Sequence, residues 1–289
     1  MAESPPNLRL LDTSDAAREL DLASELFHRI NRVIPQNQSL LTVPPKHRAR
    51  DAIAQMSEYG YSQVPVVDND KVLGVFSYRS FAHVAATMKL EELNQDRCSP
   101  GDLPVDEFLE QFEFARVTAE MSHVFDFMDR DNGVLIGTAE RLVGVLTPMD
   151  FLRYLHEVAS PFVLVSEIEL ALRELIRIAL TPEQIVVAAE RCLVPRDGTV
   201  PTSLEEMSFE NYRSLLSNGD TWKEFEPVFG STRNRTSAKL KEVGAIRNDL
   251  FHFKRDPTVQ DHQTLASRRN WLLIKIKQVE ARHRAGKQP

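Results

Sequence analysis

A short pattern occurs twice in this sequence, 70 residues apart. Residues Leu73–Phe81 (LGVFSYRSF) align with Val143–Phe151 (VGVLTPMDF), and a glycine, a hydroxyl residue and a phenylalanine coincide. In both copies a β-rich run leads into a helical stretch. Two copies are too few for a solenoid, which needs at least three repeats. The repeat therefore predicts an α+β module that consists of two similar helix–strand–strand–helix halves.

Each half of this module shows the same order of elements. Apolar residues at helical spacing come first, and two short runs rich in valine, leucine and isoleucine follow. The Asp-Asn-Asp sequence at Asp68–Asp70 is typical of a turn between two strands. We expect strands at Val64–Val67, Val72–Phe76, Val134–Ile136 and Arg141–Leu146, and helices at Asp51–Tyr59 and Thr118–Met128.

The residues on either side of the repeat form an N-terminal segment and a C-terminal part. A length of 289 residues suggests two domains. We assign residues 1–39 to a tail with one helix, residues 40–158 to the repeat, and residues 160–285 to an all-helical domain. The helix of the tail is expected at Asp15–Ile34, because Pro35 cannot continue it.

Strand signals are absent after Ser160, and the apolar residues recur at three and four positions. Thr181 is a candidate N-cap, with Pro182 at the first helical position. This part is therefore expected to be a bundle of four or five helices. The main helices are predicted at Val163–Leu180, Pro182–Leu193, Asn211–Ser217, Thr236–Phe253 and Val259–Arg284.

The composition is that of a globular protein and excludes several classes. Hydrophobic residues make up 42% and charged residues 27% of the chain. No run approaches the ~18 apolar residues that a membrane span needs, and the N-terminus has no secretory signal pattern. Cys98 and Cys192 form neither a disulfide framework nor a metal-binding spacing. We expect a soluble, cytoplasmic protein with no membrane partner.

Charge is distributed unevenly along the chain. Residues 231–289 hold 14 Lys and Arg and 5 Asp and Glu, so the net charge of −7 hides a basic C-terminal segment. Such a segment favours a phosphate-bearing partner. The alternative is a solvated helix face that docks on its own acidic neighbour. The same two interpretations apply to Arg268–Arg269 and to Lys275 and Lys277.

Thr147 and Asp150 follow a predicted strand and open a predicted helix. Backbone N–H groups and the helix dipole attract phosphate at such a position. A hydroxyl and a carboxylate three residues apart can bind a phosphate and a ribose diol. The same residues also suit a plain helix start, with Thr147 as N-cap, Pro148 at the first position and Asp150 near the positive end of the dipole.

The repeat resembles a tandem pair of CBS domains. The resemblance rests on Arg50–Phe81, which includes GYSQVPVVD at Gly60–Asp68, and on a more divergent second copy at Phe114–His156. CBS pairs commonly bind adenine nucleotides between their repeats. The resemblance thus implies AMP, ADP or ATP as a regulatory ligand, without a required metal. A pair with no ligand, used only for dimerisation, is the alternative.

The resemblance also assigns roles to individual residues. It implies that Thr147 contacts phosphate and Asp150 contacts ribose, and that Val64 and Pro65 of the first copy belong to the ligand site. In the first copy, Ser77 keeps the hydroxyl, but Ser80 stands where the ribose-binding aspartate is expected. We therefore expect one competent nucleotide site at most.

Arg247, Asn248 and His252 form a second group with possible chemistry. Asn248 and His252 are four residues apart and share a helix face. Arg247 lies about 140° from His252 around an ideal helix, so spacing alone does not unite the pair. Histidine suits proton transfer near neutral pH, and arginine binds phosphate with forked donors. The alternative pairs Arg247 with Asp249 or Glu242 in a purely structural role.

The helical part resembles the HEPN superfamily, which includes many ribonucleases. Its signature is an arginine, often followed by a polar residue, and a histidine a few residues later, as in Arg247, Asn248 and His252. In that family two protomers bring their motifs into one cleft. The resemblance implies a homodimer or a higher even oligomer, an RNA substrate, and products with 2′,3′-cyclic phosphate and 5′-hydroxyl ends. Glu167 or Glu169 would face the cleft.

Two functions remain open from the sequence. The first is a metal-independent endoribonuclease that cleaves RNA through Arg247 and His252 under control of a nucleotide in the CBS pair. The second is a catalytically silent, nucleotide-sensing module whose helical domain binds RNA or a partner protein. Loss of turnover on replacing His252 would distinguish the enzyme from the binding module.

Overall fold

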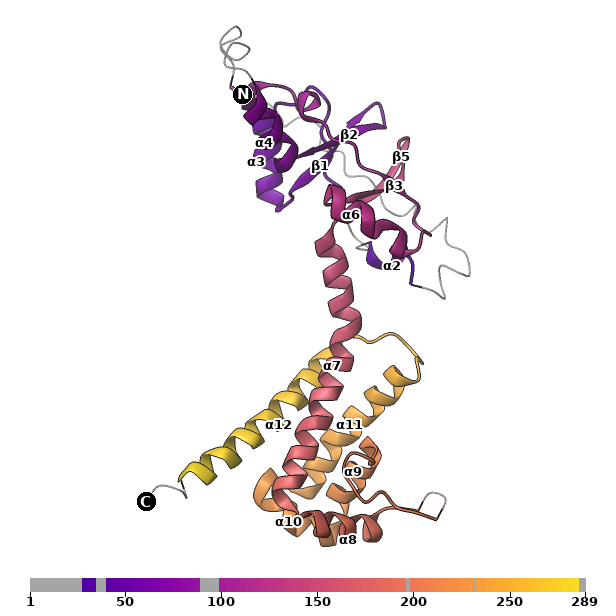
Figure 1. The fold of residues 1–289 in the computed structure, drawn as a ribbon, viewed down its shortest axis with the longest axis vertical. Coiled ribbons are helices and arrows are strands. Elements are labelled where there is room, and N and C mark those ends of the chain that lie inside the picture. The colour runs from indigo at the N-terminus through magenta and orange to yellow at the C-terminus, as the bar shows by residue number, and fades with distance from the viewer. Residues whose placement is uncertain (1–27, 35–39, 89–98, 196–197, 231, 286–289) are drawn as a thin grey trace, which may run out of the picture. The chain divides into compact units, whose positions relative to one another are not determined.

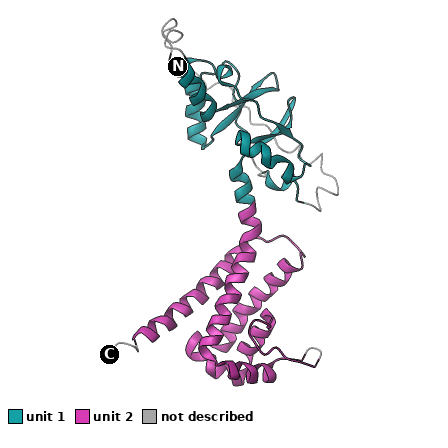
Figure 2. Ribbon diagram, in the orientation of Figure 1, with its two compact units in different colours: residues 1–154 teal, residues 155–289 magenta. Residues whose placement is uncertain are grey.

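The computed structural model describes residues 28–34, 40–88, 99–195, 198–230 and 232–285. The chain forms two compact units, unit 1 (Met1–Tyr154) and unit 2 (Leu155–Pro289) (Figures 1 and 2). Most of the N-terminal helix predicted at Asp15–Ile34 lies outside the described residues. Its described end is a single turn, α2 (Ile30–Val33), that stops before Pro35.

The first half of unit 1 has the predicted helix–strand–strand–helix order. Helix α3 (Ala49–Tyr59) is followed by β1 (Gln63–Asp68), β2 (Lys71–Ser77) and α4 (Tyr78–Thr87) (Figure 1). The two strands pair antiparallel. The turn Asn69–Asp70 joins them with positive φ at both residues, and Asn and Asp tolerate this conformation better than most residues.

The second half repeats the strand pair but not the whole helix. Strands β4 (Val134–Thr138) and β5 (Arg141–Leu146) are antiparallel, and β3 (Phe114–Ala115) pairs parallel with β4. The helix predicted at Thr118–Met128 is present only in part. A 3-10 helix spans Met121–Val124, and α6 follows from Phe125 to Asp131. The backbone carbonyls of residues 117 and 119 accept hydrogen bonds from residues 30 and 31, so they do not enter a helix.

The internal repeat is confirmed in the register of the strands. Val66 is paired with Gly74, and Ile136 with Gly144, and both pairs lie 70 residues apart. Each ladder has its irregularity directly after this pair. The bulge is therefore part of the repeated unit.

The two halves of unit 1 share a core. Each half has its own buried cluster, around Phe76 and Phe108 in the first and Ile136 and Leu146 in the second. A third cluster contains residues of both, which explains why the halves form one unit. Its buried members are Leu40, Val72, Val75, Phe112, Leu135, Leu142 and Val145.

Helix α7 (Pro148–Ala179) is much longer than predicted. The sequence placed a helix start at Val163, whereas the structure has one helix of 32 residues that contains Pro161. A proline inside a helix removes one backbone hydrogen bond and normally marks a boundary. Apolar residues on both sides of it are buried, among them Phe151, Val165 and Ile168. Burial on either side accounts for a helix that continues through the proline.

Unit 2 is largely helical in its described residues. After α7 come α8 (Pro182–Cys192), α9 (Phe209–Ser217), α10 (Gly219–Phe229), α11 (Arg233–Phe251) and α12 (Val259–Ala285) (Figure 1). These helices enclose one continuous apolar core. In the described residues of the chain, no helix is both long and apolar enough to span a membrane.

The helix starts and ends in unit 2 follow local capping chemistry. Thr181 caps α8 as predicted, with Pro182 at the first position. Helix α11 starts three residues before the predicted Thr236 and ends at Phe251 rather than Phe253. The φ of Phe253 is +51°, and its N–H bonds back to the carbonyl of Leu250. This left-handed residue closes the helix and leaves His252 just outside it.

Candidate functional site

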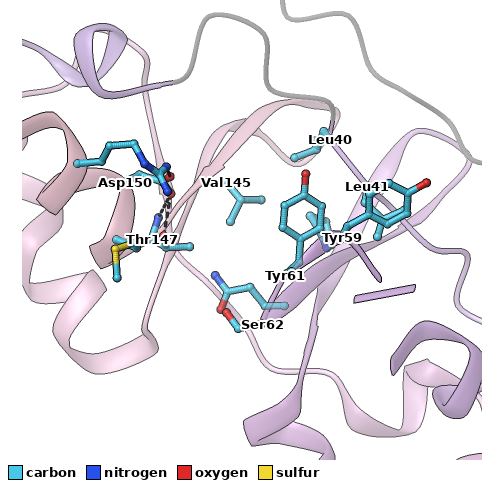
Figure 3. A pocket seen from close by; sticks show the side chains of 13 residues that line it. Leu40, Leu41, Tyr59, Tyr61, Ser62, Val145, Thr147 and Asp150 are labelled. Carbon is cyan, nitrogen blue, oxygen red and sulfur yellow. Dashed lines mark hydrogen bonds and ion pairs between the residues drawn. The ribbon is translucent and has the colours of Figure 1, made fainter. Parts of the chain in front are cut away.

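A cavity of about 350 Å³ lies in unit 1 where β5 leads into α7. Residues of both CBS-like halves line it, and Figure 3 shows Thr147 and Asp150 on one side, with Tyr59, Tyr61 and the leucines opposite. The strand ladder fixes where β5 ends, and Thr147 and Asp150 follow directly at the start of α7. The predicted pair Thr147 and Asp150 therefore belongs to one cavity, together with Pro65.

Thr147 and Asp150 are hydrogen-bonded to each other. The Thr147 hydroxyl donates to an Asp150 carboxylate oxygen at 2.7 Å, and the Thr147 backbone N–H donates to the same oxygen at 2.9 Å. The other carboxylate oxygen pairs with Arg153 at 3.3 Å. The capping role and the cavity position thus occur together, and the carboxylate is 13% exposed. A ligand that hydrogen-bonds to Asp150 replaces the contacts of this carboxylate with Thr147 and Arg153.

Two tyrosines complete the cavity opposite Thr147, and the sequence analysis did not identify them. The rings of Tyr59 and Tyr61 are stacked, with centroids 6.2 Å apart and an interplanar angle of 15°. Gly60 between them has a φ of +71°, which ends α3 and turns both rings to one side. The Tyr-Gly-Tyr sequence directly before the strand is the signal that could have found them.

Val64 and Pro65 differ in their surroundings. Pro65 lines the cavity. Val64 is fully buried in the core of the first half and does not line it. The alternation of side chains along β1 sends neighbouring residues to opposite faces, so only one of the two reaches the cavity wall.

Ser77 and Ser80, the first-copy counterparts of Thr147 and Asp150, are already engaged. Both are buried and form a capping box at the start of α4. The Ser77 hydroxyl also donates to the carboxylate of Glu110. Arg79 pairs with the same carboxylate at 2.6 Å. The counterpart of Glu110 in the repeat is Leu40, 70 positions earlier, which lines the cavity at Thr147. A carboxylate in this place repels phosphate, so Ser77 offers no anion site.

Arg247 has an acidic partner that neither sequence alternative named. Its Nε lies 3.3 Å from a carboxylate oxygen of Glu169 on α7, and its guanidinium stands 4.9 Å from the ring centroid of Phe251. Glu242 instead pairs with Arg268, and Asp249 with Arg255. Of the two α7 glutamates proposed for the cleft, Glu169 contacts Arg247.

Further contacts extend from Glu169 into the core of unit 2. Arg173 lies 3.8 Å from Glu169 and donates to the Tyr212 hydroxyl at 2.7 Å. That hydroxyl donates in turn to the carbonyl of Leu204. Burial raises the pKa of Tyr212, although Arg173 opposes the shift. The neutral tyrosine hydroxyl thus accepts a hydrogen bond from Arg173 and helps fix it, and Arg173 in turn helps hold Glu169.

Asn248 and His252 are exposed at the end of α11. Among the described residues, neither side chain has a hydrogen-bond partner. Glu167 pairs with Arg269 on α12 at 2.7 Å and is not part of the Arg247 contacts. Asn248 lies in the last turn of α11, Arg247 directly precedes that turn, and His252 is the C-cap residue. The structure brings these three to one helix end without joining their side chains.

The segment after His252 is held by an ion-pair cluster. Arg255 contacts Asp249 at 3.2 Å and Asp261 at 2.5 Å. Asp261 is buried and accepts a hydrogen bond from the Thr258 N–H at 2.8 Å. Arg255 and Thr258 hold the pKa of Asp261 well below its usual range, against the effect of burial. The connection between α11 and α12 is therefore fixed at both ends.

Comparison with known proteins identifies the first copy of the repeat. Residues 23–87 match the model of the CBS domain family. The chain is 26% identical over 148 residues to the A-adding tRNA nucleotidyltransferase of Geobacter sulfurreducens, a match that covers 46% of this chain and 16% of that protein. The chain thus spans about a sixth of the length of this curated relative.

Similar solved structures cover the N-terminal half of the length. An uncharacterized conserved protein from Pyrococcus horikoshii is 22% identical, with a TM-score of 0.35 over 43% of this chain and 89% of that one. A CBS domain-containing protein of unknown function from Bacillus anthracis is 16% identical, with a TM-score of 0.37 over 45% of this chain and 93% of that one. The family match and the repeated strand register show that the N-terminal half of this chain has a CBS-type α+β fold, followed by a largely helical part.

Proposed function

We propose that this chain is a nucleotide-regulated, metal-independent endoribonuclease. CBS domains commonly bind adenine nucleotides, and the cavity at Thr147 and Asp150 is the observation that carries the regulatory half of the proposal. Its chemistry suits a nucleotide from end to end. The first turn of α7 and the Thr147 hydroxyl bind phosphate, Asp150 accepts from the ribose diol, and the tyrosine pair offers an aromatic surface for the base.

The charges at the cavity favour a nucleoside monophosphate. Arg153 is the one cation among its described lining residues, and it neutralises Asp150. A triphosphate would bring several negative charges to a site that holds one positive side chain and one helix N-terminus. AMP is therefore the ligand that we expect to bind most tightly.

Calorimetric titration with AMP tests this half of the proposal. We expect one AMP per chain, because Glu110 closes the first-copy site. Asp150→Ala should weaken binding about 10-fold or more, since a hydrogen bond to a charged group contributes about 1.5–3 kcal/mol. Ser80→Ala, at the matched position of the first copy, should leave affinity unchanged. Two AMP per chain, or equal losses in both variants, would contradict the proposal.

The catalytic half of the proposal places RNA cleavage at the end of α11. The 2′-hydroxyl oxygen attacks the adjacent phosphorus, and the bond from phosphorus to the 5′-oxygen breaks. His252 is exposed and has no partner among the described residues. It accepts the proton of the 2′-hydroxyl and donates a proton to the leaving 5′-oxygen. Arg247 stabilises the charge that develops on the phosphate. The products are a 2′,3′-cyclic phosphate and a 5′-hydroxyl, and no water or metal enters the step.

Glu169 has a positioning role in this proposal. It holds the guanidinium of Arg247 at its Nε, which leaves the terminal nitrogens available for phosphate. Phe251 supports the same group from its ring face. Arg247 is 28% exposed, so a phosphate can reach it from one side.

A homodimer is part of the proposal because one protomer offers an incomplete site. The residues that follow Arg247 expose large apolar side chains, with Phe251 44%, Phe253 85% and Val259 74% exposed. Apolar groups gathered around a polar site are typical of a protein interface. A second copy that covers them would bring two Arg247–His252 pairs together.

Cleavage of an RNA pool in the presence of EDTA tests the enzyme. The wild-type protein should leave cyclic-phosphate ends. His252→Ala should lower the rate about 100-fold or more through loss of general acid–base catalysis, and Arg247→Ala about 100-fold or more through loss of charge stabilisation on the phosphate. His262→Ala provides a matched histidine control and should keep its activity. Wild-type protein that cleaves no RNA with or without AMP would overturn the endoribonuclease.

One observation favours the silent binding module instead. Arg247 is already neutralised by Glu169, and Asn248 has no described partner that would orient it. If RNA is retained equally by the wild type and by His252→Ala without any cleavage, the helical unit is a binding module under nucleotide control.

A further inference from the structure

Helices α11 and α12 pack against each other and carry four cations on one side of unit 2. The set consists of Arg235, Lys239, Arg268 and Lys275 and is called here the α11–α12 basic cluster. The positive charges of the other three lower the pKa of Lys239, in addition to the larger effect of burial. The Lys239 ammonium lies over Trp271 of α12, so the cations of the two helices gather around Lys239.

The basic cluster has little internal compensation. Its single carboxylate is Glu242, which pairs with Arg268 at 2.5 Å. Lys275 donates to the neutral amide of Gln278. Among the described residues, Arg235 and Lys239 take part in no ion pair. Like charges that share a half-buried site destabilise one another unless an anion joins them.

Lys239 is held in place rather than free in solvent. Its ammonium nitrogen lies 4.4 Å from the ring centroid of Trp271, and the tryptophan in turn packs against Phe229. A cation over an aromatic face loses part of its hydration but keeps its donors. The ammonium group is thus positioned before any ligand arrives, which lowers the ordering cost of binding.

We propose that the α11–α12 basic cluster is a second RNA contact that binds the phosphate backbone away from the Arg247–His252 end of α11. The choice of RNA as the anion rests on the proposed function. The cluster binds backbone and not bases, because it combines fixed lysines and arginines with an aromatic ring already covered by Lys239. It raises affinity for longer RNA without sequence preference and takes no part in the cleavage step.

The test measures binding of a short single-stranded 2′-O-methyl RNA by fluorescence anisotropy over a series of KCl concentrations. This RNA cannot be cleaved by attack of its 2′-oxygen, so binding is measured apart from catalysis. The test variant is the double substitution Lys239→Gln with Lys275→Gln. The matched control is Lys241→Gln with Lys277→Gln, which removes the same charge two positions along each helix, on exposed faces.

The expected result is a change in the salt dependence. Removing two phosphate contacts should lower the slope of log affinity against log salt by about 1.4, at about 0.7 per contact on a single strand. The control should bind like the wild type. The single variant Arg235→Gln, at an exposed position, should lower the slope by about 0.7 and serves if the double variant does not fold.

Three outcomes separate this inference from the proposed nuclease. A protein that cleaves no RNA but shows the slope change supports the basic cluster alone. A protein that cleaves RNA while test and control variants share one slope overturns the cluster. Binding to polyglutamate is measured in the same way. If the test variant loses binding to polyglutamate but not to RNA, the RNA contact is overturned, and the surface binds an acidic protein instead.

Discussion

At the scale of single residues, Arg247 pairs with a carboxylate that local spacing does not reveal. Arg247 has Asp249 and Glu242 nearby in sequence, yet it pairs with Glu169, 78 residues away. The reason lies in packing, which brings α7 beside the last turn of α11. The sequence could nominate Arg247 and His252 as chemical groups, but only the tertiary contacts show which acid holds the arginine.

Asp261 gives a residue-scale prediction about stability. The carboxylate joins Arg255 to the first turn of α12 and is 10% exposed. Asp261→Asn should lower the free energy of unfolding of unit 2 at neutral pH by about 1–3 kcal/mol, the usual contribution of a hydrogen-bonded charge. Chemical denaturation of wild type and variant measures the difference, and Glu224→Gln is an exposed control.

The pH dependence of that difference follows from the direction of the shift. The pKa of Asp261 is lowered in the folded state, so its contribution is complete above the unfolded pKa, about 3.9. It is lost as the pH falls below that value toward the folded pKa. The gap between wild type and Asp261→Asn should therefore shrink in acid. A gap that grows as the pH falls would show that the ion pair is not what stabilises this connection.

At the scale of elements, the repeat was predictable, and so were the helix boundaries set by local caps, such as Thr181 before α8. The strands appear where the β-rich runs are, because short apolar runs bounded by turn residues are local signals. The long helix α7 escaped prediction since Pro161 mimics a boundary, while the burial that carries the helix through it is tertiary. The helix predicted at Thr118–Met128 starts late for a similar reason, as its first carbonyls bond to the α2 turn.

The candidate nucleotide site shows the same division between local and distant information. Thr147 and Asp150 were found from a hydroxyl and a carboxylate at a helix start, which is a local pattern. For the first copy, the sequence indicates a defective nucleotide site only through Ser80, which stands in place of the ribose-binding aspartate. The physical cause of the defect is Glu110, held by its backbone against Val75 and so placed beside Ser77. No spacing in the sequence relates Glu110 to that serine.

At the scale of the whole molecule, one helix carries residues of both candidate sites. The first turns of α7 hold Thr147, Asp150 and Arg153 at the cavity, and its later turns hold Glu169 against Arg247. A ligand can shift the helical unit only if it binds one of two arrangements more tightly. Under the proposed function, AMP is that ligand.

The rate of RNA cleavage as a function of AMP concentration tests this account most directly. The wild type should change its rate as AMP saturates, and Asp150→Ala should need at least about 10-fold more AMP for the same change, with Ser80→Ala responding like the wild type. His252→Ala should stay inactive at every AMP concentration. An active enzyme whose rate is the same with and without saturating AMP would contradict nucleotide control of the helical unit.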